Sequence, residues 1–220
     1  MKLNFSFLAL AIGLFTNQGC ATNNLLKSTG IFRSGNEESM RNSALIIVDL
    51  QNDFCPKGSL AVKDGDKIIP TVNALIKKYK SLGNPIYATR DWHPSNHMSF
   101  KSSGGPWPVH CVQNTPGAAF HPDLMIDDAI VINKGSLVDE EAYSGFNGTN
   151  LAQKLKERGV TDLTICGLAT DYCVKATVLD GINSGFTVTV IKDGIRGVNV
   201  KPEDSKKALE AMMSAGAVIK

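Results

Sequence analysis

The sequence predicts an α/β fold, with a six-stranded parallel sheet and helices on both faces in a Rossmann-like three-layer arrangement. Three observations predict it. From residue 44 onward, short apolar runs alternate with segments of helical periodicity. The runs are apolar throughout, as expected of strands buried on both faces. The helical segments end at or near a glycine, which is typical of a helix C-terminus.

Each element follows from its local pattern. The strands are short, largely apolar runs, beginning with "ALIIVDL", and are expected at 44–50, 85–92, 129–134, 162–168, 187–193 and 217–220. The segments between them show apolar residues three or four positions apart, and the expected helices are 66–82, 149–159, 170–184 and 202–216. Pro70 and Pro202 each suit the first turn of a helix.

Composition limits the function classes. A chain of 220 residues that is 43% hydrophobic can bury one sizeable core, and we expect a single domain over 43–220. The net charge of +2, without a run of Lys or Arg, argues against a nucleic acid partner. The five cysteines lack a C-x-x-C spacing, which argues against a zinc ribbon or a thioredoxin-type motif. An oligomer is compatible with these totals.

The amino terminus differs from the rest. "MKLNFSFLALAIGLF" has one early Lys and an apolar run too short to span a bilayer, which is the form of a secretory signal. Residues 1–21 are expected to be a signal peptide cleaved after Ala21, or a lipoprotein leader that anchors the chain to a membrane through Cys20. Residues 22–42 are polar and suggest a flexible linker. Export is the favoured interpretation; without a functional signal the protein is cytoplasmic.

Three reactive side chains stand at or just beyond the ends of predicted strands, where open α/β sheets bind ligands. Asp49 and Lys134 each end an apolar strand, and each alone suggests an ion pair or a side chain reaching the surface. Cys173 follows Thr170, an expected N-cap, so that a helix N-terminus favours its thiolate. If the strands are neighbours, acid, amine and thiol converge. Cys166 lies inside a strand and is expected to fill the core.

A second cluster lies in and beside the long irregular insert 93–128. Asp91 and His93 form a D-x-H pair at a strand end, and His110 can close a metal site with them. His97 is a candidate fourth ligand. The alternative is a set of surface polar residues, although three of the four histidines of the chain fall within residues 93–110.

Five ordered motifs carry a resemblance to a known family: "ALIIVDLQNDFCPKGSLAV", "YATRDWHPSNHMSF", "WPVHCVQNTPG", "INKGS…YSGF" and "CGLATDYCVKATVLD". They resemble bacterial and yeast nicotinamidases, of the isochorismatase-like cysteine hydrolase superfamily, from Ala44 to the carboxyl end. The resemblance implies an isochorismatase-like hydrolase fold. It also implies hydrolysis of nicotinamide, or a related pyridine carboxamide, to nicotinate and ammonia through a cysteine thioester, in NAD salvage.

Position by position, the resemblance implies roles for particular residues. The implied catalytic triad is Asp49, Lys134 and Cys173. The implied ligands of a divalent metal ion, usually zinc, are Asp91, His93 and His110. Leu168 and Ala169 correspond to a cis peptide, and the implied oxyanion-hole amides are those of Ala169 and Cys173. The implied aromatic walls of the substrate pocket are Phe54, Trp107 and Tyr143.

Three alternative functions fit parts of the same sequence. The first is a related hydrolase of the same fold that acts on another small amide. Cys173 argues against an isochorismatase, because isochorismatases need no thiol nucleophile. A non-catalytic exported protein that captures pyridines would release no ammonia. In a zinc hydrolase with an inert Cys173, the metal would activate water directly. Cys55 and Cys111 lie within the shared motifs and are expected to be free thiols.

Overall fold

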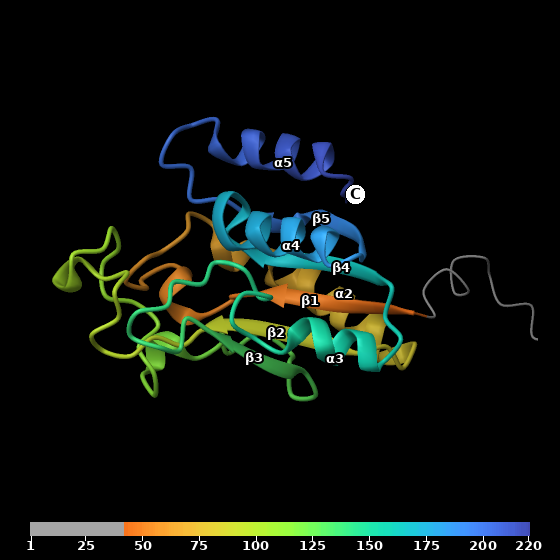
Figure 1. Cartoon of the computed structure of the whole chain (residues 1–220), viewed down its shortest axis with the longest axis horizontal. Helices are drawn as coiled ribbons and strands as arrows, with labels where there is room; N and C mark the ends of the chain where they lie inside the picture. Colours follow the sequence, from red (N-terminus) through yellow and green to blue (C-terminus); the bar gives the residue numbers. More distant parts are fainter. Residues whose placement is uncertain (1–41) are drawn as a thin grey trace, which may run out of the picture. The chain divides into compact units, whose positions relative to one another are not determined.

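The computed structural model describes residues 42–220 and contains the predicted six-stranded sheet, in which every neighbouring pair of strands is parallel (Figure 1). The strands are β1 Ser43–Val48, β2 Ile86–Asp91, β3 Ile130–Lys134, β4 Asp162–Leu168, β5 Thr187–Arg196 and β6 Val218–Ile219. Their order is β3-β2-β1-β4-β5-β6. The order reverses between β1 and β4, and this is the point at which such sheets open a crevice for a ligand.

The helices lie on both faces of the sheet, as predicted. They are α2 Ile69–Ser81, α3 Leu151–Glu157, α4 Lys175–Asn183 and α5 Asp204–Ser214. The side chains of β1 alternate between two cores: Ile46 packs in the cluster that includes residues of α3, α4 and α5, and Ile47 packs in the cluster that includes residues of α2. Both faces of the central strand are therefore buried, which explains its continuous apolar sequence.

Three local expectations differ from the structure. Thr170 is not an N-cap, because it is the first residue of a π-helical turn, Thr170–Val174, that precedes α4. The N-cap of this turn is Ala169, which makes no side-chain hydrogen bond. Pro202 does not lie in the first turn of α5, which begins at Asp204. Strand β5 continues to Arg196, beyond the expected end at 193.

The expectations for residues 1–21 and for most of the linker 22–42 lie outside the described residues. Within 42–220, no helix has the length and apolar character needed to cross a membrane.

Gly167 sets the distance between β1 and β4 at the edge where the strands end. Its φ of +120° is one that L side chains rarely adopt, and a Cβ built on it would lie 2.0 Å from the Val48 carbonyl oxygen. A side chain at this position would push apart the two strands that flank the crevice. The glycine of the "CGLAT" segment is therefore required by close backbone contact.

Replacing Gly167 with Ala should destabilise the fold by at least about 2 kcal/mol, because a clash with backbone adds to an unfavourable φ. The free energy of unfolding in urea measures this loss. Gly83→Ala is the matched control, since Gly83 also has a positive φ (+70°), but a Cβ placed on it would have no atom within 4 Å. The control should lose only about 1 kcal/mol. Equal losses in the two variants would contradict the close-contact argument.

Candidate active site

The structure brings the three expected catalytic residues together at the crevice between β1 and β4. Asp49 follows β1, Lys134 ends β3, and Cys173 lies in the π-helical turn after β4. The Lys134 Nζ atom lies 3.0 Å from Asp49 Oδ2 and 3.5 Å from Cys173 Sγ. All three residues are buried. A carboxylate oxygen of Asp49 lies within 4.8 Å of the Cys173 sulfur, so the acid and the amine both lie beside the thiol, as the sequence interpretation required.

Asp49 is held in one orientation by its backbone and by Thr89. It has a φ of +45°, in the left-handed region that Asp tolerates better than most residues. The Thr89 hydroxyl donates a hydrogen bond of 2.6 Å to Asp49 Oδ1. Asp49 Oδ2 has the ion-pair contact with Lys134 but accepts no hydrogen bond from the described residues. This oxygen is free to accept a proton from the neighbouring thiol.

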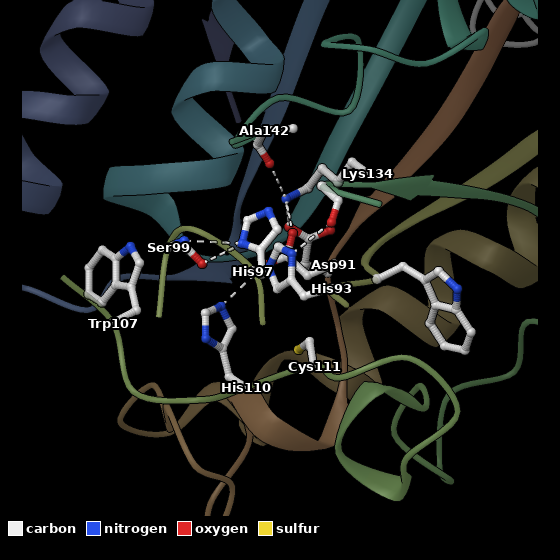
Figure 2. Close-up of polar contacts among 12 residues, drawn as sticks. Asp91, His93, His97, Ser99, Trp107, His110, Cys111, Lys134 and Ala142 are labelled. Atoms are coloured by element: carbon white, nitrogen blue, oxygen red, sulfur yellow. Dashed lines mark hydrogen bonds and ion pairs between the residues drawn. The ribbon is translucent and has the colours of Figure 1, made fainter. Parts of the chain in front are cut away.

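Lys134 is 1% exposed, so the interpretation of a lysine that reaches the surface is wrong. Its Nζ atom donates to the Ala142 carbonyl oxygen at 3.0 Å and to Asp91 Oδ1 (Figure 2). It also forms an ion pair with Asp49. Burial alone would lower the pKa of this amine, but the Asp49 and Asp91 carboxylates outweigh burial and raise the pKa well above its usual value. The amine is therefore protonated at neutral pH.

Burial and the Lys134 ammonium act in opposite directions on the pKa of Asp49. Burial dominates, and it raises the pKa although the Lys134 ammonium opposes it. Burial also raises the pKa of the Cys173 thiol well above its usual value, with Lys134 again opposing. The expectation that a helix N-terminus favours the thiolate is thus outweighed by desolvation. The resting thiol is protonated, and it must lose its proton as it attacks.

The expected metal ligands Asp91, His93 and His110 converge beside this group (Figure 2). The Nε2 atoms of His93 and His110 lie 3.5 Å and 3.8 Å from Asp91 Oδ2. Each imidazole donates its Nδ1–H to a backbone carbonyl, from His93 to Gly135 at 2.9 Å and from His110 to Pro108 at 2.8 Å. These bonds fix the tautomer that leaves Nε2 free to coordinate. One carboxylate and two imidazoles with an open side fit a divalent ion such as zinc.

His97 is buried beside this cluster, but neither of its ring nitrogens is free to coordinate a metal ion. Its ring stacks on that of His93 with centroids 4.1 Å apart. Its Nε2–H donates to the Glu140 carbonyl oxygen at 3.0 Å, and its Nδ1 accepts from the Ser99 hydroxyl at 2.7 Å. Because both ring nitrogens are engaged, His97 supports the ligand His93 from behind.

A pocket opens between the metal-binding residues and Cys173. The three expected aromatic residues Phe54, Trp107 and Tyr143 all line it. The Trp107 indole N–H donates to the Tyr143 hydroxyl at 2.9 Å, which joins two separate loops across the pocket. The walls are therefore mainly aromatic and apolar, and Asp91, His110 and Cys173 also line the pocket.

Sequence reasoning missed several residues that line the same pocket: Leu60, Val62, Tyr172 and Val198. Tyr172 packs edge-on against Trp107 with ring centroids 5.1 Å apart, and its position beside Cys173 was an available signal. Val198 follows β5 and comes from a distant part of the sequence, so no local pattern indicated it. Thr89, which orients Asp49, was missed for the same reason.

The turn between β4 and Cys173 has the backbone that the resemblance implied. The peptide bond between Leu168 and Ala169 is cis, and both residues line the pocket. The assignment of the Ala169 and Cys173 amides to an oxyanion hole stays a prediction. Cys55 and Cys111 are free thiols, as expected, and Cys166 is fully buried within β4.

Comparison with known proteins places this geometry in a family. The model of the isochorismatase domain matches residues 43–220. The nicotinamidase of Escherichia coli K12 is 45% identical over 199 residues, which cover 80% of this chain and 93% of that protein. The pyrazinamidase of Pyrococcus horikoshii, solved in complex with zinc, is 55% identical with a TM-score of 0.78 and covers 81% and 98% of the two chains.

A structure from L. infantum in complex with nicotinate is 35% identical with a TM-score of 0.76, and the match covers 82% of this chain and 92% of that one. The matched region includes every residue of the site described above. The chain belongs to the isochorismatase domain family.

Proposed function

We propose that this protein hydrolyses nicotinamide to nicotinate and ammonia through a thioester on Cys173, as a step of NAD salvage. The observation that carries the proposal is the Cys173 sulfur, which lies 3.5 Å from the Lys134 ammonium and lines an aromatic pocket together with Asp91 and His110 of the metal-binding set. Relatives named as nicotinamidases and the related structure with bound nicotinate support this substrate.

The first half of the reaction forms the thioester. The Asp49 carboxylate accepts the thiol proton of Cys173 as the sulfur attacks the carboxamide carbon. The Ala169 and Cys173 amides would stabilise the oxyanion that forms. Asp49 then returns its proton to the amide nitrogen, the C–N bond breaks, and ammonia leaves. A carboxyl whose pKa is raised by burial suits this exchange, because it holds the proton between the two steps.

The second half returns the enzyme to its resting state. Asp49, again a carboxylate, accepts a proton from water as the water oxygen attacks the thioester carbon. The C–S bond breaks and nicotinate is released, and the sulfur recovers the proton from Asp49. Throughout the cycle Lys134 stays charged and keeps the carboxyl of Asp49 near the sulfur.

The set Asp91, His93 and His110 would hold a divalent ion, and zinc is the ion we propose, since the related pyrazinamidase was solved with zinc. When bound, the ion supplies open coordination positions to the ring nitrogen and so orients the ring in the pocket. Phe54 and Trp107 enclose the ring and exclude water.

We also propose that the leader directs export, because its residues have the form of a secretory signal. The intact mass of the mature protein tests this: loss of the first 21 residues, or lipid on Cys20, supports export. An unprocessed amino terminus on protein isolated from its native cells would contradict it.

Cys173→Ala should reduce ammonia release from nicotinamide by at least about 1,000-fold, because no other side chain in the pocket offers a comparable nucleophile. The zinc content of the variant should equal that of the unmodified protein. Normal turnover by this variant would remove the nucleophile assignment. Mass spectrometry of the unmodified enzyme during turnover should show the acyl adduct on Cys173, which a mechanism using metal-activated water alone would not form.

His93→Ala should lose most of its zinc and bind nicotinamide more weakly, because one of three ligands is missing. His97→Gln should retain one zinc ion per chain, since both nitrogens of His97 bond to protein groups. Metal content by elemental analysis and substrate binding by calorimetry measure these effects. Loss of zinc in both variants alike would contradict the separation of ligand from supporting residue.

Lys134→Met should destabilise the metal-free protein by about 3–5 kcal/mol, because it leaves the buried Asp49 and Asp91 carboxylates without their cation. Urea unfolding in the presence of a chelator measures the change. Lys80→Met is the control, since Lys80 forms an exposed ion pair with Asp128 and should change stability by less than about 1 kcal/mol. A loss at Lys134 no larger than at Lys80 would show that the buried cation is not needed for the fold.

A further inference from the structure

Three consecutive polar residues after β1 contact the insert that carries His110. The Gln51 amide donates to the carbonyl oxygens of Asp91 at 2.8 Å and Ala118 at 2.9 Å, and its oxygen accepts the Asp91 N–H at 2.8 Å. The Asn52 amide donates to the Pro116 carbonyl oxygen at 2.8 Å. These contacts attach the insert to the sheet at the point where Asp91 leaves β2.

The third of these residues, Asp53, acts at the metal-binding loop itself. Its Oδ2 atom accepts the Cys111 N–H at 2.7 Å. Cys111 directly follows His110, and its carbonyl oxygen accepts the His93 N–H at 3.0 Å. Cys111 is therefore the residue that connects the two imidazole ligands, and the Asp53 carboxylate holds its amide.

Cys111 needs this restraint because its backbone is in an unfavourable conformation. Its φ is +47°, in the left-handed region that few residues other than Gly, Asn and Asp adopt. Such a conformation persists where its surroundings hold it. The thiol itself is fully buried, and Cys111 is not a member of the metal-binding set Asp91, His93 and His110.

Packing confines the Asp53 carboxylate to this position. A Cβ placed on Gly117 would lie 2.1 Å from Asp53 Oδ2, so the carboxylate fills the space between Cys111 and the backbone at Gly117. The next residue, Phe54, places its ring 5.7 Å from that of His110. Two neighbouring residues in the turn after β1 thus act on His110: Asp53 holds the backbone beside it, and Phe54 packs on its ring.

We propose that Asp53 is a positioning residue for the metal site: it holds Cys111 in its left-handed conformation and thereby sets His110 relative to Asp91 and His93. The proposal rests on the metal site of the proposed function, but it concerns metal affinity and does not depend on the substrate. Removing the carboxylate lets the Cys111 backbone relax and moves one of three ligands. Partners of this kind, one step removed from the ion, typically change metal affinity by about 10–100-fold.

The test measures zinc affinity of the full chain by competition with a chromophoric chelator. Asp53→Ala should bind zinc about 10–100-fold more weakly. Asp53→Asn should lose less, because it keeps one acceptor oxygen for the Cys111 N–H. Gly117→Ala should also weaken zinc binding, because its methyl group displaces the carboxylate without removing it.

The matched control is Asp171→Ala. Asp171 is a buried carboxylate in a different loop, and it accepts two backbone N–H bonds, from Val198 at 2.9 Å and Asn199 at 2.8 Å. This variant should keep zinc affinity within about threefold of the unmodified protein, since its carboxylate touches no residue that adjoins a ligand. The alkylation rate of Cys173 by a small thiol reagent, measured without metal, should be unchanged in the Asp53 variants.

Zinc affinity within about threefold of the unmodified protein in Asp53→Ala, or an equal loss in Asp171→Ala, would overturn the proposal. If Asp53→Ala does not fold, unchanged affinity in both Asp53→Asn and Gly117→Ala would overturn it. The proposed function fails separately: an unmodified protein that binds zinc yet releases no ammonia from nicotinamide would remove that function and leave the role of Asp53 intact.

Discussion

The buried ammonium of Lys134 is the interaction on which the site depends. It lies between two carboxylates, Asp49 at the end of β1 and Asp91 at the end of β2, and it is also 3.5 Å from the Cys173 sulfur. Without this cation, two negative charges would be enclosed together away from water, at a cost of several kcal/mol. One side chain therefore makes it possible to place an acid, a thiol and a metal-binding carboxylate within one small volume.

The same cation connects the metal-binding residues with the nucleophile. Asp91 directs Oδ1 to Lys134 and Oδ2 to the two imidazoles, so the group that binds the amine also completes the metal set. The metal-binding residues and the nucleophile are consequently fixed relative to each other. A carboxylate oxygen of Asp91 lies within 4.8 Å of the Cys173 sulfur, so a ring held by the metal-binding set would lie beside the nucleophile, as a positioned attack requires.

The supporting residues show how the side chains of an irregular insert are held in defined positions. Residues 93–128 contain little regular structure, yet their position is set by Gln51 and Asp53 from the turn after β1 and by backbone carbonyls that orient His93 and His110. The resulting site stands on the rigid edge of a parallel sheet, while the insert supplies ligands and aromatic walls. This division explains how a long loop can place a ligand accurately.

The sequence by itself determined the element order and the parallel sheet, because apolar runs and helical periodicity are local signals. It also singled out residues that the structure brings together at one site, because the motifs have a characteristic spacing. It did not determine the protonation of Cys173, the non-ligand role of His97, or the contributions of Thr89, Tyr172 and Val198. These depend on which groups meet across the sheet: desolvation of the thiol outweighs the favourable turn, and both nitrogens of His97 are engaged by protein groups, one of them far along the chain. Only the tertiary structure decides such contacts, since they join residues that no local pattern connects.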